Sequence, residues 1–155
     1  MSHKPIKIMS VKTLKDLYLF ELENLRKEIS AYKKEQNLWL IQAEVNNSAG
    51  NLCLHLTGNI QHFIGTLIGK TDYIRNREAE FNDKHQSKAD LLKEIEVAMQ
   101  VASATFDKMS EADLTSIYPI DFMGVQTTDF YLTRFLAHLS YHLGQISYHR
   151  RLLDK

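Results

Sequence analysis

The sequence predicts an all-α protein, a four-helix bundle with long interhelical connections, and three observations favour this class. The 155 residues include only two prolines and six glycines, so long stretches carry no helix breaker. Apolar residues recur three and four positions apart along four segments, which is the spacing of one helix face. The connections over 69–86 and 110–127 are too long for a simple array of helical hairpins.

The first predicted helix spans about Val11 to Lys33 and is amphipathic, with glutamate, lysine and arginine on its polar face. Its apolar positions are Leu14, Leu17, Tyr18, Leu22, Leu25, Ile29 and Tyr32. Residues 34–48 form a connection, but its sequence LWLI at 38–41 is too apolar for a free loop. We expect that piece to pack on the bundle as a short turn or an extended segment.

The second predicted helix, about Ala49 to Ile68, follows capping residues at 46–48 and carries two stripes. The apolar stripe consists of Leu52, Leu56, Ile60, Phe63 and Leu67. The polar stripe, offset by about 100°, consists of Asn51, His55, Asn59 and His62. Because buried polar groups need partners, the polar stripe indicates either exposed surface or a functional site.

Two further helices are expected after polar connections. Residues 69–86 are interpreted as a loop, and Ser87 is placed to cap a third helix over about Lys88 to Met109. Residues 110–127 contain a proline and a glycine and form the second long connection. Thr127 or Thr128 can cap the last helix, about Asp129 to Leu153.

Composition limits the class of partner and the compartment. Basic and acidic residues number 19 each, whereas nucleic-acid-binding domains usually have a pI above about 9. No apolar run approaches the ~20 residues that cross a membrane, and MSHKPIKIMS lacks the apolar region of a signal peptide. Cys53 is the only cysteine, so no intrachain disulfide can form. We expect one cytoplasmic domain, 1–155, with 1–9 flexible and with no nucleic-acid or membrane partner.

His138 and His142 are the most informative pair in the chain. Residues four apart on a helix share one face, with Cβ atoms about 5–6 Å apart, so both imidazoles can bind one metal ion. His55 is the candidate third ligand, which would leave coordination positions open for chemistry. The pair is not an HExxH protease motif, because Leu139, Ser140 and Tyr141 separate the two histidines.

The remaining histidines fit this site less well. His62 and His149 each lie seven residues from a candidate ligand, about 10.5 Å further along the helix. In antiparallel helices the two move apart and become cavity-rim or surface residues, whereas in parallel helices they could form a rival pair. His3 and His85 fall in segments predicted to be flexible and are not candidates.

Polar residues near the histidines are candidates for supporting the ligands. Metal-binding histidines usually donate their other ring N–H to a neighbouring group, and Asn51, Asn59, Tyr141 and Gln145 are suitably placed. For Gln145, a hydrogen bond that serves only helix packing is an equal alternative.

Three arginines are candidates for binding the substrate. Arg75 and Arg77 could bind a carboxylate through paired hydrogen bonds, or could instead pair with acidic neighbours in the same loop. The acidic neighbours are Asp72, Glu78 and Glu80. Arg134, four residues before His138, faces the same opening.

The chain resembles the DinB-like superfamily over nearly its whole length. In that group one ligand histidine lies in a pattern like LxHLxxN, matched here by His55, and two lie in HxxxHxGQ, matched by His138 and His142 with Gly144 and Gln145. The resemblance implies an up-down-down-up four-helix bundle, often a homodimer, that binds its ion near one end. The segment DYIRNREAEF resembles a branch of the superfamily with no assigned reaction.

Similar superfamily members include bacillithiol S-transferases and mycothiol-dependent isomerases. The resemblance therefore implies a divalent ion, zinc or nickel, and a transferase that joins a small-molecule thiol to an electrophilic substrate. A hydrolase using the same three histidines is the nearest alternative. A non-catalytic dimeric bundle is the third.

Overall fold

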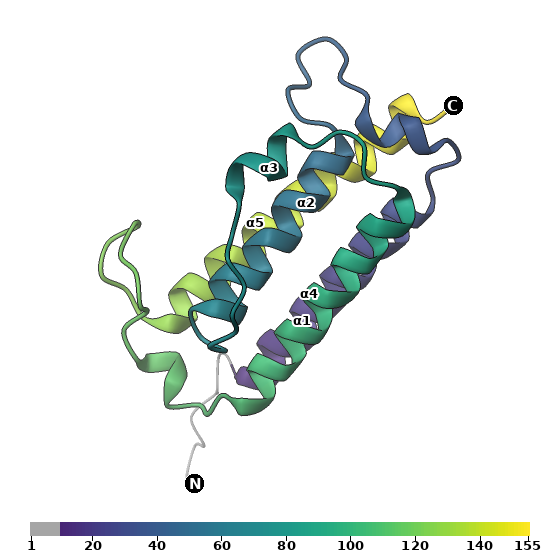
Figure 1. Cartoon of the computed structure of the whole chain (residues 1–155). Coiled ribbons are helices and arrows are strands. Elements are labelled where there is room, and N and C mark those ends of the chain that lie inside the picture. Colours follow the sequence, from purple (N-terminus) through teal and green to yellow (C-terminus); the bar gives the residue numbers. More distant parts are fainter. Residues whose placement is uncertain (1–9) are drawn as a thin grey trace, which may run out of the picture.

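The computed structural model describes residues 10–155, and within that range it contains helices and no strand (Figure 1). Its long helices are α1 (Val11–Ser30), α2 (Ala49–Asn59), α4 (Lys88–Lys108) and α5 (Thr128–Leu153). Its shorter segments are the 3-10 helices η1 (Glu35–Trp39) and η3 (Asp113–Thr115), the π-helix η2 (Ile60–Thr66) and the α-helix α3 (Arg77–Asn82). The all-helical class is confirmed, while the expectation of a flexible 1–9 lies outside the described residues.

The expected capping residues begin the long helices. The side chains of Ser48 and Ser87 each accept a hydrogen bond from the backbone N–H three residues on, at 3.1 Å. Ser10 caps α1 in the same way at 3.0 Å, and Thr127 is the residue before α5. Each such cap typically stabilises a helix end by about 1 kcal/mol.

Contacts between α2 and α5 show that the two helices run in opposite directions. Asn59 lies beside His138, while Phe63, four residues further along the chain, stacks on Phe135 with ring centroids 4.5 Å apart. Residue numbers therefore rise in α2 as they fall in α5. The segment that follows His55 therefore lies beside the first half of α5 and not beside its second half.

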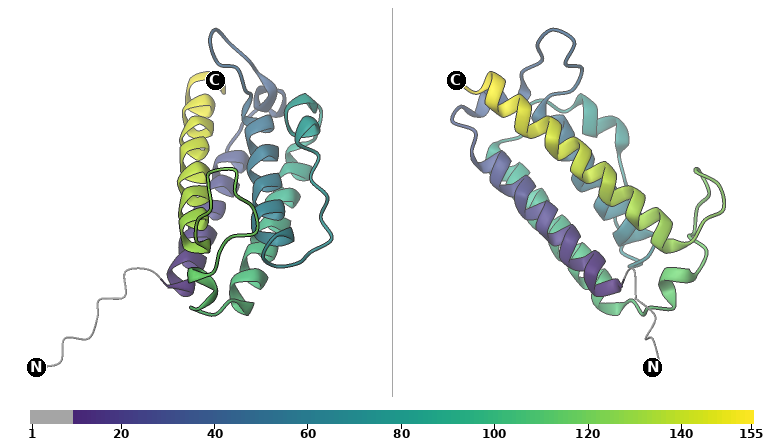
Figure 2. Two further views of the ribbon diagram at one scale, coloured as in Figure 1. Left: turned by 90° about the vertical axis from the view of Figure 1, so that its left-hand side faces the viewer. Right: turned by 180° about the vertical axis from the view of Figure 1, so that it is seen from behind.

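Helix α1 runs in the same direction as α5, and the two lie side by side in the rear view of Figure 2. Near the start of both helices, the Tyr18 hydroxyl donates to the Leu132 carbonyl at 2.6 Å. Near the end of both, Arg150 Nε donates to Glu28 Oε2 at 2.7 Å. The first and last long helices are thus parallel neighbours in the bundle.

Helix α4 packs antiparallel to α1. Lys15, near the start of α1, pairs with Asp107 at the end of α4 at 2.6 Å. Lys88, the first residue of α4, donates to the Tyr32 carbonyl beyond the end of α1 at 3.0 Å. In Figure 1, α1 and α4 therefore lie along one side of the molecule and α2 and α5 along the other.

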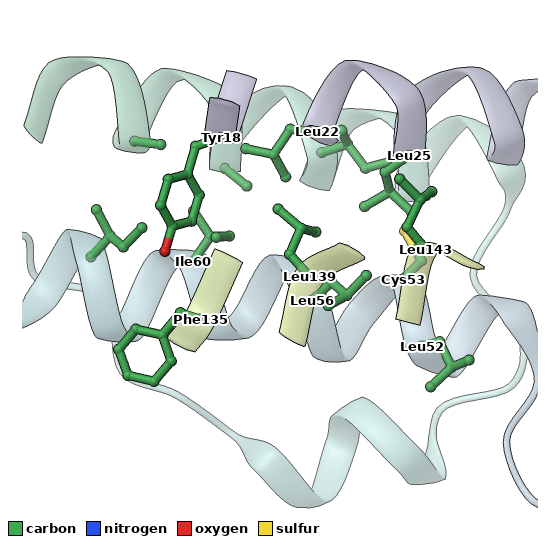
Figure 3. Close-up of a cluster of buried hydrophobic side chains, with 14 of the residues drawn as sticks. Tyr18, Leu22, Leu25, Leu52, Cys53, Leu56, Ile60, Phe135, Leu139 and Leu143 are labelled. Carbon is green, nitrogen blue, oxygen red and sulfur yellow. The ribbon is translucent and has the colours of Figure 1, made fainter. Parts of the chain in front are cut away.

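The core lies where these helices face one another (Figure 3). Side chains from α1 meet side chains from α2 and α5, and most are at most 3% exposed. The labelled members are Tyr18, Leu22, Leu25, Leu52, Cys53, Leu56, Ile60, Phe135, Leu139 and Leu143. Burial of such side chains supplies about 1.5–3 kcal/mol each, which makes this layer the main stabilising element.

The connections contain more helix than the sequence predicted. The loop expected over 69–86 includes α3, and the two other connections include η1 and η3. In η1, Trp39 lies so close to Gly50 that a Cβ there would come within 2.6–2.7 Å of its ring. These short segments form because tertiary contacts outweigh the weak helical propensity of their sequences.

The second predicted helix also changes type within its length. From Ile60 to Thr66 it is a π-helix, in which Leu67 N–H bonds the His62 carbonyl at 3.0 Å and Gly69 N–H bonds the Ile64 carbonyl at 2.9 Å. The sequence did not predict this change, because over so few residues the spacing of apolar side chains does not distinguish a π-helix from an α-helix. Such segments occur frequently at functional sites.

The hydropathy of the helices bears on the expectation that the chain has no membrane-spanning run. Within residues 10–155, no helix is both long enough and apolar enough to cross a lipid bilayer.

The carboxylate of Asp154 ties the end of α5 to the end of α1. It accepts hydrogen bonds from the Lys33 and Lys34 backbone N–H groups at 2.6 and 3.2 Å, and from Asn37 Nδ2 at 2.9 Å. Burial would raise the pKa of Asp154, but these hydrogen bonds outweigh it and lower the pKa below its ordinary value. Asp154 therefore stabilises the fold in its ionised form.

We expect Asp154→Ala to lower the free energy of unfolding by about 1–3 kcal/mol, because three donors lose a buried acceptor. The carboxylate binds fewer protons in the folded than in the unfolded state. Its contribution is therefore present above pH ~4 and is lost as pH falls through the lowered pKa. Urea unfolding at pH 7 and pH 3 measures both effects, with exposed Asp121→Ala as the control. Equal stability of the two variants at pH 7 would contradict this role.

Candidate metal centre

Three histidines converge because α2 packs antiparallel on α5. His138 Nε2 lies 3.3 Å from His55 Nε2 and 3.1 Å from His142 Nε2. One ring nitrogen from each residue lies within 4.8 Å of the others. Nitrogens that share a tetrahedral ion at about 2.0–2.1 Å are separated by roughly 3.3 Å. The spacing therefore fits a metal site.

Burial keeps the imidazoles ready to bind metal. His55 is 8% exposed, and His138 and His142 are half-buried. Burial, with the nearby His142 and His55, lowers the pKa of His138 to about 4. Burial also lowers the pKa of His142, although its hydrogen bond with Gln145 opposes the shift. Both rings are neutral at pH 7, which is the form that coordinates metal.

A buried carboxylate orients His55. Its Nδ1–H donates to Glu80 Oε2 at 2.9 Å, which leaves the Nε2 lone pair directed toward the other two histidines. Arg75 in turn donates two hydrogen bonds to Glu80, at 2.7 and 2.8 Å. Burial would raise the pKa of Glu80, but the hydrogen bonds from Arg75 and His55 outweigh it and lower the pKa. Glu80 is therefore an ionised acceptor.

Helix α3 positions Glu80. Asn76 caps this helix by accepting from the Ala79 backbone N–H at 3.1 Å. Asn51 on α2 donates to the Glu80 carbonyl at 3.0 Å and to the Asp83 carbonyl at 2.7 Å. Asn51, expected to contact a histidine, thus instead secures the helix that carries the partner of His55.

Sequence reasoning missed the role of Glu80, although the helix that carries it had a signal. Asn76 followed by Glu78 and Glu80 has the cap and acidic first turn of a helix start. The structure also gives a reason for Gly58, because a Cβ at that position would lie 2.3 Å from Glu80 Oε1. Only glycine allows the carboxylate to approach α2 this closely.

Gln145 and Asn59 contact the other two ligands, whereas Tyr141 makes only a ring contact. His142 Nδ1–H donates to Gln145 Oε1 at 2.6 Å, which again leaves Nε2 available. Asn59 Nδ2 lies 3.2 Å from His138 Nδ1, and rotation of this amide by 180° presents its oxygen as an acceptor for the ring N–H. Tyr141 is 64% exposed and packs its ring against His142 at 5.2 Å.

A cavity of about 250 Å³ opens beside His55 and His138. All three candidate arginines line it, and Arg75 is also tied to Glu80, the acidic partner that the sequence left open. Aromatic rings form much of the remaining wall, namely Phe63, Phe122 and Phe135. The site thus combines imidazoles whose spacing suits a metal ion, positive charge and an apolar aromatic wall.

The possible rival pair does not form. His149 accepts from the Tyr32 hydroxyl at 2.7 Å and donates from Nε2 to the Leu40 carbonyl at 2.9 Å. His149 is 6% exposed and lines a separate cavity of about 690 Å³. Of the two positions expected for His149, the surface position is therefore wrong and the position at a cavity is confirmed. His62 is half-buried in the π-helix and packs on Phe63, while His85 is exposed.

Comparisons with known proteins agree with the fold and leave the reaction open. Residues 12–155 match the family described as "Protein of unknown function (DUF1572)". No curated protein matches the sequence. The crystal structure of a DinB-like protein from Bacillus cereus ATCC 10987 is similar, with a TM-score of 0.73, 18% sequence identity and coverage of 92% of each chain. The chain therefore belongs to the DUF1572 family, and its fold is similar to that of the DinB-like protein from Bacillus cereus.

Proposed function

We propose that this protein is a metal-dependent enzyme in which His55, His138 and His142 hold a divalent ion, zinc or nickel. The proposal takes the four long helices as an up-down-down-up bundle that brings α2 and α5 together. The observation that carries it is the convergence of three Nε2 atoms, with the Nδ1 atoms of His55 and His142 held by Glu80 and Gln145. Such a pattern is typical of metal-binding imidazoles.

The reaction of this enzyme is transfer of a low-molecular-weight thiol to an electrophilic substrate. When bound, a divalent ion with three imidazole ligands supplies Lewis-acid chemistry, including deprotonation of a thiol at neutral pH. Among residues 10–155, those that line the cavity include no serine, cysteine, lysine, aspartate or glutamate. Glu80 lies behind His55 and is occupied by Arg75. A reaction in which the co-substrate supplies the nucleophile therefore fits this cavity better than one that needs a protein nucleophile.

In that reaction, the chain's own residues bind and orient the reactants. His55, His138 and His142 fix the point at which the thiol sulfur is held, and Glu80 keeps the ring of His55 in position. The aromatic wall excludes water from one side of the cavity. The thiol sulfur forms a bond to the electrophilic carbon, the bond from that carbon to its leaving group breaks, and the thiol proton passes to solvent.

The metal site is tested by loading the purified protein with zinc or nickel and measuring bound ion by elemental analysis. We expect about one ion per chain, and loss of stoichiometric binding in His138→Ala and His142→Ala because two ligands cannot hold the ion as tightly. His62→Ala is the control and should retain the ion. Unchanged stoichiometry in both ligand variants would rule these residues out.

Glu80→Gln should weaken metal binding about 10–100-fold, because the neutral amide no longer provides a charged acceptor for His55 and a partner for Arg75. Competition with a chromogenic chelator measures the change. Glu78→Gln, an exposed glutamate on the same short helix, is the matched control. If both variants bind metal equally, Glu80 does not support the site.

Thiol dependence separates the candidate reactions. We expect the metal-loaded protein to release chloride from a chlorinated aromatic only when a low-molecular-weight thiol is present, and His142→Ala to lose that activity. Glutathione, cysteine and bacillithiol are the thiols to compare. Turnover of ester or amide substrates without any thiol would favour a hydrolase instead. A protein that binds no ion and turns over neither class would leave the non-catalytic dimeric bundle.

A further inference from the structure

We infer that the cavity beside His138 binds a small organic anion with a flat apolar body, and that Arg77 and Arg134 hold its anionic group. This inference deepens the proposed function by naming the class of its electrophilic substrate. It depends on the side chains of the cavity wall, whereas the metal proposal depends on the three histidines. The two can therefore fail separately.

Arg77 and Arg134 differ from Arg75 in having no acidic partner. Within the described part of the chain neither forms an ion pair or a side-chain hydrogen bond, and residues 1–9 contain no aspartate or glutamate. The guanidinium of Arg77 lies 5.3 Å from the centre of the Phe81 ring, which helps to hold it at the opening. Two cations that line one cavity without a carboxylate indicate a site for an external anion.

The cavity is also positive as a whole. No aspartate or glutamate is among its lining residues. The nearest carboxylate, Glu80, is buried and already shared between Arg75 and His55. Arg75 stays in this pair, because separating the two would leave the Glu80 carboxylate buried without its charged partner. Arg77 and Arg134 are therefore the cations available to a ligand, and a cationic ligand is disfavoured.

The remaining wall indicates the body of the ligand. Phe63 and Phe135 stack with centroids 4.5 Å apart and an interplanar angle of 17°, and Phe122 lies at 21° to Phe135. These rings pack on one another and together give the cavity an apolar aromatic wall, against which the flat body of a ligand is buried. A volume of about 250 Å³ corresponds to roughly eight water molecules, so the ligand is the size of a substituted benzoate rather than a nucleotide.

The test measures binding of benzoate, phenylphosphonate and uncharged benzamide by calorimetry, with metal-free and metal-loaded protein. We expect benzoate or phenylphosphonate to bind at least about tenfold more tightly than benzamide, since hydrogen bonds to charged groups are the stronger class. Arg77→Gln and Arg134→Gln should each weaken anion binding about tenfold and leave benzamide unchanged. Arg134→Lys should recover part of the loss.

Arg151→Gln is the matched control, because Arg151 also lies on α5 and beside an aromatic ring, but outside the cavity. Equal binding of benzoate and benzamide, or no binding of either, would overturn the inference. So would anion binding that is lost in His142→Ala but unchanged in both arginine variants, because the anion would then be a metal ligand. If the protein binds the organic anion but takes up no metal ion, this inference stands and the proposed metal-dependent enzyme fails.

Discussion

The ionised carboxylate of Glu80 is the group on which the candidate site depends. It is 5% exposed and lies between a histidine of α2 and an arginine of the preceding connection. A carboxylate in such a position is tolerated only with strong partners, because removing it from water costs several kcal/mol. The same bonds that satisfy this charge also fix the ring of His55, so stability and site geometry share one interaction.

Several features of the chain serve that interaction. Gly58 leaves space for the carboxylate, Asn51 holds the backbone of α3, and Asn76 begins α3. The connection between the second and fourth α-helices is therefore part of the site rather than a link between helices. In Figure 1, α3 lies beside α2, where this contact can form.

Local patterns made much of the architecture predictable. Three-four apolar spacing, with capping residues before all but the first helix, identified where the long helices start to within a residue, and the four-residue spacing of His138 and His142 identified a shared face. His55 was already the candidate third ligand in the sequence, and the family resemblance supported its convergence with this pair, because spacing in one helix says nothing about another. The hydrogen bond from His55 to Glu80 and the burial of His149 were missed, because the partners of these histidines, Glu80 and Tyr32, come from other elements. Tertiary hydrogen bonds of this kind have no signal in local sequence.

The π-helix of residues 60–66 has a consequence for how this region tolerates change in chain length. Its hydrogen-bonded turns enclose one more residue than α-helical turns, as the bond from Leu67 to His62 shows. Deleting a single residue here would allow regular α-helix while shortening the path to Arg75 and α3. The segment joins the two halves of the site, the histidine on α2 and the acid–arginine pair beyond it, so a change in its length alters the chain between them. Insertions or deletions are better accommodated in the exposed stretch around Gly124.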